Sequence, residues 1–296
     1  MSQFKAGFIT FVGRPNVGKS TLTNALVGEK IAITSSKPQT TRKAIRGICN
    51  TESAQLIIVD TPGIHRPRTL LGQRLNDVVE NTLGEVDVIG FCIPADEKLG
   101  PGDAYINTAL DRYPRAKLVA LVTKCEKVSK EALAAQLIAV DALRNWEAII
   151  PVSAVTGEQL EVLKQVLGDL LPQSQALYPV DQATEETVES RIAELIREAA
   201  LEGSRDELPH SLAVTIEEHG KREGSDVYDI HANLWVERDS QKPIVIGKGG
   251  ARLKEIGSQA RKEIEALVGS RVMLRIHVKV APAWQQDPKQ LGRLGL

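Results

Sequence analysis

The chain has 296 residues, a formal net charge of −1 and only 3 cysteines. This length is enough for two domains that each bury a core without disulfides or metal ions. The balanced charge argues against a uniformly basic nucleic-acid binder. The charge is nevertheless uneven, because residues 242–296 carry eleven basic and four acidic side chains. An anion-binding end has this pattern, and so does a solvated helix face.

The sequence shows no pattern of disulfide-bonded or metal-binding cysteines and no pattern of a targeting segment. Cys49, Cys92 and Cys125 are widely spaced and form no cluster with histidine, which indicates a reduced compartment and no cysteine metal site. No apolar run approaches the roughly 18 residues of a membrane helix, and the N-terminus lacks the pattern of a secretion signal. We therefore expect a cytoplasmic protein without a transmembrane segment.

The first part of the chain alternates short apolar runs with helical patterns. The runs "GFITFVG", "AQLIIVD", "VDVIGFCIP", "KLVALVTK" and "AIIPVSA" read as buried strands, and residues 19–26, 131–143 and 160–170 read as helices. Strands this continuously apolar predict an α/β domain, a mostly parallel sheet with helices on both faces, over residues 1–172. Residues 173–182 are polar, contain proline and have no period, as is typical of a linker.

Residues 183–296 predict a second domain of the α+β class. A helical pattern, "TVESRIAELIREAALEG", precedes two alternating strands, "SLAVTIEEH" and "YDIHANLWVER". A short apolar run then breaks into glycines before a basic helix, and "RVMLRIHVKVA" ends the pattern as a strand. The predicted order is therefore α-β-β-α-β.

A phosphate-binding loop follows the first strand. "GRPNVGKS" matches G-x-x-x-x-G-K-[ST] between a strand and a helix, the context that this P-loop requires. Its backbone N–H groups and the helix N-terminus favour phosphate, its lysine reaches the β- and γ-phosphates, and its serine can ligate Mg²⁺. The nucleotide-binding residues predicted here are Gly13, Arg14, Pro15, Asn16, Val17, Gly18, Lys19 and Ser20.

A second nucleotide segment, "VDTPG", ends an apolar strand. Asp60 can hold Mg²⁺ through water and the Gly63 N–H can sense the γ-phosphate, with Thr61, Pro62 and Ile64 beside them. The polar loop "SSKPQTTRKAI" offers Thr40 and Thr41 to complete the Mg²⁺ shell, and we favour Thr41. The expected metal ligands are thus Ser20, Thr41 and Asp60, and the catalytic residues are Lys19, Thr41 and Gly63. A loop ordered by the γ-phosphate is a switch.

The base-reading loop is "TKCE", where many GTPases have Asn-Lys-x-Asp. Glu126 keeps a carboxylate for guanine N1–H and the exocyclic amine, one methylene further out. Thr123 can tether the P-loop, Lys124 can lie along the base next to Cys125, and Ser153 or Ala154 can offer a backbone N–H to guanine O6. We interpret this as guanine binding at reduced affinity. The alternative is that "TKCE" is only a polar strand end.

The turn "VIGKGG" is the G-x-x-G loop of a KH domain, placed before a basic helix. Glycines let the backbone approach the sugar-phosphate chain of about four nucleotides, and apolar neighbours form a floor for bases. The predicted RNA-binding residues are Ile244, Ile246, Gly247, Lys248, Gly249, Gly250, Arg252 and Lys254. A mere helix-start turn is the alternative, and Trp284 in the tail is expected to bury part of the core rather than to stack a base.

With these motifs in order, the chain resembles an Era-type GTPase. The resemblance covers nearly the whole chain through "GRPNVGKS", "PQTTR", "VDTPG", "VSA", "ELPHS" and "VIGKGG". It implies a P-loop GTPase domain that binds GTP or GDP with Mg²⁺, followed by a type II KH domain. It also implies a cytoplasmic ribosome-assembly factor that binds the 3′ end of small-subunit ribosomal RNA and associates peripherally with the membrane. Thr123 and Glu126 depart from the family pattern of Asn or Thr followed by Asp.

The resulting prediction is a monomeric, slow GTP-hydrolysing switch coupled to single-stranded ribosomal RNA and the small ribosomal subunit. Ile64 cannot polarise water as glutamine does, which predicts slow turnover, and Asn16 is a candidate to hold K⁺ beside the phosphates. Two rival interpretations remain. One is an RNA-binding scaffold with a structural nucleotide site, and the other is an ATPase that acts on RNA.

Overall fold

The computed structural model describes residues 4–35, 37, 40–63, 69–203 and 208–295. The chain forms two compact units. The first comprises Met1–Ala32, Thr41–Arg66 and Leu75–Glu185, and the second comprises Ile33–Thr40, Pro67–Arg74 and Glu186–Leu296. The loop that precedes Thr41 therefore groups with the C-terminal unit.

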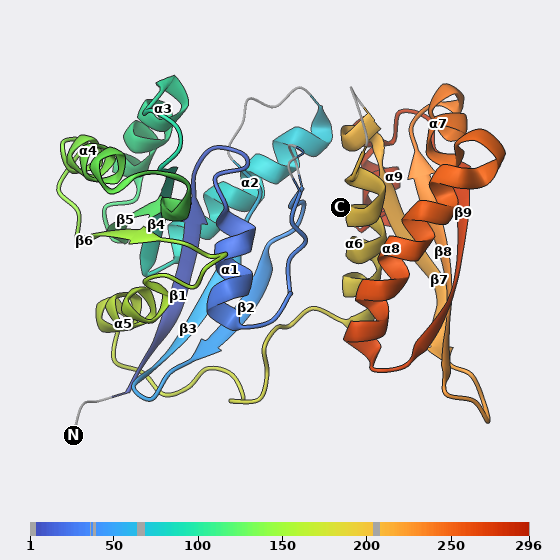
Figure 1. The fold of residues 1–296 in the computed structure, drawn as a ribbon, viewed down its shortest axis with the longest axis horizontal. Coiled ribbons are helices and arrows are strands. Elements are labelled where there is room, and N and C mark those ends of the chain that lie inside the picture. Colours follow the sequence, from blue (N-terminus) through green and yellow to red (C-terminus); the bar gives the residue numbers. More distant parts are fainter. Residues whose placement is uncertain (1–3, 36, 38–39, 64–68, 204–207, 296) are drawn as a thin grey trace. The chain divides into compact units, whose positions relative to one another are not determined.

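The N-terminal unit alternates strands and helices (Figure 1), and its sheet is six-stranded with the order β2-β3-β1-β4-β5-β6. All neighbouring strands are parallel except β2 and β3, which are antiparallel. The prediction of a mostly parallel sheet is confirmed. The elements are β1 (Lys5–Val12), α1 (Lys19–Val27), β2 (Ile45–Asn50), β3 (Ala54–Asp60), α2 (Leu70–Glu85), β4 (Val88–Pro94), α3 (Pro101–Ala109), β5 (Lys117–Thr123), α4 (Lys130–Asp141), β6 (Ala148–Val152) and α5 (Leu160–Leu170).

Helices cover both faces of this sheet, because alternate residues of each strand enter two separate cores. On one face, Ile9 and Phe11 of β1 pack with Leu22 of α1 and Leu163 of α5. On the other face, residues of β4 and β5 pack with α2, α3 and α4. This layering buries the central strands β3 and β4 completely, which explains why they read as continuous apolar runs.

The edge strand β2 was not identified from the sequence. Its segment is short and contains Gly47, which weakens a strand pattern. The structure shows why glycine stands there, since a Cβ at Gly47 would collide with Ile31 and would lie 2.7 Å from Val27 Cγ2.

The segment after α5 is hydrogen-bonded to the edge strand β2 and to its neighbour β3. The Ile48 amide donates to the Ala183 carbonyl at 2.8 Å. Gln55, which is fully buried, accepts the amides of Leu177 and Tyr178 at 2.7 and 2.9 Å. The segment up to Glu185 is therefore bound to the first unit rather than suspended between domains.

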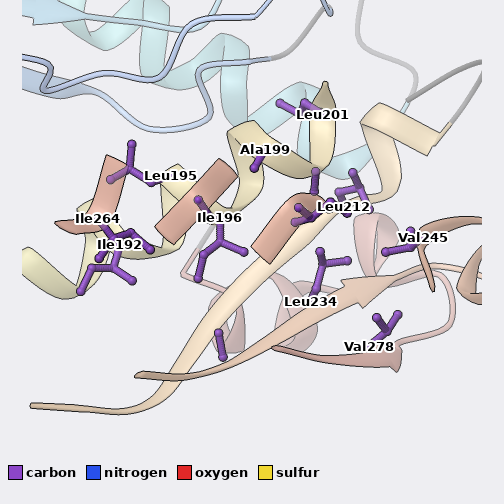
Figure 2. Packing of buried hydrophobic residues seen from close by; sticks show 14 of the residues in the cluster. Ile192, Leu195, Ile196, Ala199, Leu201, Leu212, Leu234, Val245, Ile264 and Val278 are labelled. Carbon is purple, nitrogen blue, oxygen red and sulfur yellow. The ribbon is translucent and has the colours of Figure 1, made fainter. Parts of the chain in front are cut away.

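The C-terminal unit contains a three-stranded sheet with the order β7-β8-β9, in which β7 and β8 are antiparallel and β8 and β9 are parallel. Helices α6 and α8 carry much of its core (Figure 2), including Ile192, Ile196 and Ile264. The elements are α6 (Val188–Leu201), β7 (Ala213–Lys221), β8 (Val227–Val236), α7 (Lys242–Ile246), α8 (Ala251–Val268), β9 (Arg271–Val280) and α9 (Pro288–Arg293).

The predicted order α-β-β-α-β requires one correction. The apolar run before the glycines is the short helix α7, so the order from α6 to β9 is α-β-β-α-α-β. Proline lies in the first turn of α7, where its missing N–H costs nothing. Five residues are too few for a helical period, and the sequence therefore did not reveal this helix. Among the described residues, no helix is both long and apolar enough to cross a bilayer.

Candidate nucleotide and RNA sites

The P-loop joins β1 to the N-terminus of α1, at the carboxyl edge of the parallel strands. Gly13 and Gly18 have φ values of 155° and 102°, and a Cβ at Gly13 would lie 2.6 Å from the Cys92 carbonyl oxygen. Lys19 Nζ donates to the carbonyls of Gly13 and Arg14 at 3.0 and 2.9 Å, and burial lowers the pKa of Lys19. The loop therefore offers a phosphate two cationic features, the positioned ammonium of Lys19 and the N-terminus of α1.

Ser20, Thr41 and Asp60 converge, as the sequence predicted for a Mg²⁺ site. Ser20 Oγ lies 2.7 Å from Asp60 Oδ2 and 3.1 Å from Thr41 Oγ1, and Thr41 Oγ1 lies 3.3 Å from Asp60 Oδ2. Thr40 instead donates its hydroxyl to the Lys37 carbonyl at 2.6 Å, which favours Thr41 as the ligand.

The donor set fits Mg²⁺, which prefers oxygen ligands. Asp60 is fully buried, and its Oδ1 has no hydrogen-bond partner among the residues that the structure describes. Burial raises the pKa of Asp60, while the hydrogen bond from Ser20 lowers it. A divalent cation held by these three residues would supply the positive charge that this carboxylate and the phosphates need.

The segment after β3 passes beside the lysine. A Cβ at Gly63 would lie 3.6 Å from Lys19 Nζ, so Gly63 lies next to the lysine that is predicted to contact the γ-phosphate. Thr61 and Pro62 are buried. The predicted nucleotide contact at Ile64 lies outside the described residues.

A pocket lies beside the P-loop at the ends of β5 and β6. Thr123 Oγ1 donates to the Val17 carbonyl at 2.7 Å, which confirms the predicted tether between the base loop and the P-loop. Lys124 has a φ of 58°, in the left-handed region. The pocket is lined by Gly18, Thr21, Leu22, Thr123, Lys124, Glu126, Lys127, Val152, Ala154 and Val155.

In the base loop, the carboxylate of Glu126 and the thiol of Cys125 lie in different surroundings. Glu126 lines the pocket, whereas Cys125 is buried and lies with its Sγ 3.7 Å from Glu158 Oε2. Burial is the main cause that raises the Cys125 pKa to about 11. The Ser153 amide donates to the Glu158 carbonyl at 3.1 Å, so Ala154, which lines the pocket, is better placed to meet guanine O6.

The G-x-x-G loop lies between α7 and α8. Gly247, Gly249 and Gly250 have φ values of 75°, 59° and 81°. A Cβ at Gly247 would lie 2.7 Å from Arg252 Cβ, whereas no heavy atom lies within 4 Å of a Cβ at Gly249 or Gly250. The second half of the loop is thus open to an approaching backbone.

Side chains around this loop divide into exposed and engaged groups. Lys248 and Lys254 are exposed, and Ile244 is 59% exposed, as expected for a floor under bases. Ile246 packs partly against the core. Arg252 forms an ion pair with Glu255 at 2.7 Å and donates to the Ala199 carbonyl at 3.4 Å, so a phosphate would compete for it.

Trp284 is fully buried and its indole donates to the Ser211 carbonyl at 3.2 Å, which confirms the expectation that it belongs to the core.

Sequence reasoning missed several residues of the nucleotide site. Thr21, Lys127 and Val155 line the pocket without belonging to a motif. Arg14 was predicted as a nucleotide contact, and the structure shows its guanidinium paired with Glu97 and Asp103. The sequence signal for Asp103 was its position at the start of a helix that opens with Gly100-Pro101.

Fold and site together define a class, a P-loop GTPase domain joined to a KH domain. The family model for a 50S ribosome-binding GTPase matches residues 8–124, and the KH domain model matches residues 207–285. The chain is 62% identical to GTPase Era of Mycobacterium sp. (strain JLS) and 60% identical to that of Mycobacterium bovis (strain BCG / Pasteur 1173P2), in each case over 100% of both chains. The chain belongs to the Era family of GTPases.

Two solved structures support this assignment. Era in complex with MgGDPNP and nucleotides 1506–1542 of 16S ribosomal RNA matches with a TM-score of 0.94 at 35% identity, over 99% of each chain. A variant of Aquifex aeolicus Era bound to GDP and AlF₄⁻ matches with the same TM-score, identity and coverage.

Proposed function

We propose that this chain is a GTP-hydrolysing switch that binds single-stranded ribosomal RNA at the 3′ end of the small-subunit RNA and assists small-subunit assembly. The observation that carries the switch is the joint placement of Ser20, Thr41 and Asp60, because Thr41 follows the loop that a γ-phosphate would order. The RNA assignment is supported by the open G-x-x-G loop and by the related Era that was solved with 16S ribosomal RNA.

Two experiments test this proposal separately. Release of phosphate from GTP by the purified protein should depend on Mg²⁺. It should be lost in Lys19→Ala, because the Lys19 ammonium, held by the Gly13 carbonyl, is the group proposed to bind the β- and γ-phosphates. Crosslinking in cells followed by sequencing should recover the 3′ region of the small-subunit RNA. RNA recovery without any GTP turnover would instead support a scaffold with a structural nucleotide site.

The choice of guanine over adenine is part of the same proposal. Glu126 lines the base pocket as an acceptor-only carboxylate, which suits the two neighbouring donors of guanine and not the donor and acceptor pattern of adenine. Competition of ATP and GTP against labelled GDP separates a GTPase from an ATPase.

We also propose that K⁺ binds beside the phosphates at Asn16. The residue lies in the P-loop with a φ of 64° and its side chain is exposed. An amide oxygen at this position can share a monovalent cation with phosphate oxygens, and that cation would take the place of an arginine finger.

The cellular setting proposed for the chain is a monomer in the cytoplasm with peripheral membrane association. Three reduced, buried cysteines support the cytoplasm, and the resemblance to the family supports the membrane association. Sedimentation of the purified protein tests the monomeric state, and flotation with lipid vesicles tests the membrane association.

A further inference from the structure

One acidic segment, residues 95–103, receives cationic side chains from both nucleotide loops. The segment follows β4 and contains Asp96, Glu97 and Asp103. It belongs to neither nucleotide motif, yet its first amide, that of Ala95, donates to the Thr123 carbonyl at 2.8 Å.

The contact with the P-loop is made by Arg14. Its Nε lies 2.9 Å from Asp103 Oδ1 and its Nη1 lies 3.0 Å from Glu97 Oε2. Asp103 is only 1% exposed, and its second oxygen accepts the Gly100 amide at 2.9 Å. The carboxylate is therefore held at the start of α3 by a backbone amide as well as by the arginine.

Gly102 makes room for this arginine. A Cβ at Gly102 would lie 2.8 Å from Arg14 Cδ and 3.2 Å from Arg14 Cγ. The stem of Arg14 thus lies against the backbone of the segment, where a side chain would displace it.

The arginine acts on the lysine through its own peptide group. Lys19 Nζ donates to the Arg14 carbonyl at 2.9 Å. The residue whose carbonyl positions the phosphate-binding lysine is therefore the one whose side chain is anchored on Asp103.

The contact with the base loop is made by lysines. Asp96 Oδ1 lies 3.9 Å from Lys124 Nζ, and Asp96 Oδ2 lies 3.5 Å from Lys127 Nζ. Both lysines line the base pocket. Gln136 of α4 holds the segment in place, because its side-chain amide donates to the carbonyls of Pro94 and Glu97 at 3.2 and 3.0 Å.

We propose that residues 95–103 are a positioning segment that sets how tightly guanine nucleotide is held, with Arg14–Asp103 fixing the phosphate loop and Asp96 fixing the lysines of the base loop. Arg14 is then a positioning residue and not a phosphate ligand. Its departure toward phosphate would leave the buried Asp103 without its cation.

The test is the rate at which a fluorescent GDP analogue leaves the protein in Mg²⁺, measured well below the unfolding temperature. We expect Arg14→Met to release it roughly tenfold faster, the loss of about one charged hydrogen bond, and Arg14→Lys to be intermediate. The matched control is Arg144→Met, because Arg144 also pairs with a carboxylate, Asp111, at 2.8 Å but is not among the residues that line the base pocket. It should release the analogue at the wild-type rate.

A double-mutant cycle separates positioning from folding. If Arg14 and Asp103 act as one unit, Arg14→Met combined with Asp103→Asn should release nucleotide no faster than the faster single variant. Additive effects, or a lowered melting temperature with unchanged release, overturn the role of Arg14.

Asp96→Asn tests the base-loop half. We expect a smaller acceleration than for Arg14→Met, because the contacts of Asp96 are longer and partly exposed. An unchanged release rate in Asp96→Asn overturns this half of the proposal.

Discussion

At the scale of single residues, Glu126 is the residue that we propose reads the base. It lines the pocket beside Lys124 and Ala154 and is one methylene longer than the usual aspartate. We predict that GDP binds more tightly than ADP, and that Glu126→Asp tightens GDP by up to the roughly 1.5–3 kcal/mol of a charged hydrogen bond. Titration calorimetry measures both affinities.

The control for this change is Glu161→Asp, which shortens an exposed carboxylate that pairs with Lys164. It should leave GDP affinity unchanged. Equal affinities for GDP and ADP would falsify the role of Glu126, and weaker GDP binding by Glu126→Asp would mean that the loop already suits glutamate.

Asn16 carries the second prediction at this scale. GTP turnover should be several-fold faster in K⁺ than in Na⁺ at equal ionic strength, because a cation beside the phosphates offsets the charge of the transition state. Asn16→Ala should remove the difference while GDP binding remains. Asn16→Gly is the necessary companion, since glycine accepts the φ of 64° that strains alanine. Identical wild-type rates in the two salts would contradict the K⁺ site.

At the scale of elements, the turn between α7 and α8 should separate RNA binding from hydrolysis. Gly249→Asp adds a carboxylate at an open position with a φ of 59°, where a phosphate would approach. We predict that affinity for single-stranded RNA falls by at least about tenfold through charge repulsion, while basal GTP turnover stays near wild type. Filter binding and phosphate release provide the two measurements.

The chain offers a closely matched control for this variant. Gly269 ends α8, has a φ of 66° and is equally open, so Gly269→Asp introduces the same strain and charge away from the loop. If both variants lose RNA affinity equally, backbone strain explains the result. Unchanged RNA binding in a folded Gly249→Asp variant rejects the site.

At the scale of the whole molecule, the segment before Thr41 is held by the C-terminal unit. The Thr34 amide donates to Glu198 Oε1 at 2.8 Å, and Arg197 donates to the Thr40 carbonyl. Both side chains belong to α6 and are buried. This segment of the C-terminal unit precedes Thr41, the predicted Mg²⁺ ligand, directly along the backbone.

This arrangement predicts reciprocal coupling between GTP and RNA. A non-hydrolysable GTP analogue should change RNA affinity, RNA should change nucleotide affinity by the same factor, and Glu198→Ala should shrink both effects. RNA titrations with and without the analogue measure the coupling. Glu265→Ala is the control, because Glu265 also accepts one backbone amide, that of Val272, at 3.0 Å. Full coupling in Glu198→Ala would refute the link.

The sequence was a good guide wherever function depends on neighbours in the chain. The P-loop, the Asp60 segment and the G-x-x-G turn are local patterns, and the structure brings the predicted Ser20, Thr41 and Asp60 together. The continuous apolar runs likewise predicted a buried parallel sheet. The elements β2 and α7 were missed because each is too short to show a period. In addition, β2 contains Gly47 and α7 contains Pro243, which weaken a strand and a helix pattern respectively.

What the sequence determined by itself is therefore the class of fold and the local motifs that indicate nucleotide and RNA binding. Only the tertiary structure decided where side chains without a motif lie. It placed Arg14 on Asp103, 89 positions along the chain, and joined Thr34 to Glu198 across 164 positions. Such contacts are set by the packing of whole elements, and no periodicity or spacing in the chain encodes which distant carboxylate a given arginine or amide will meet.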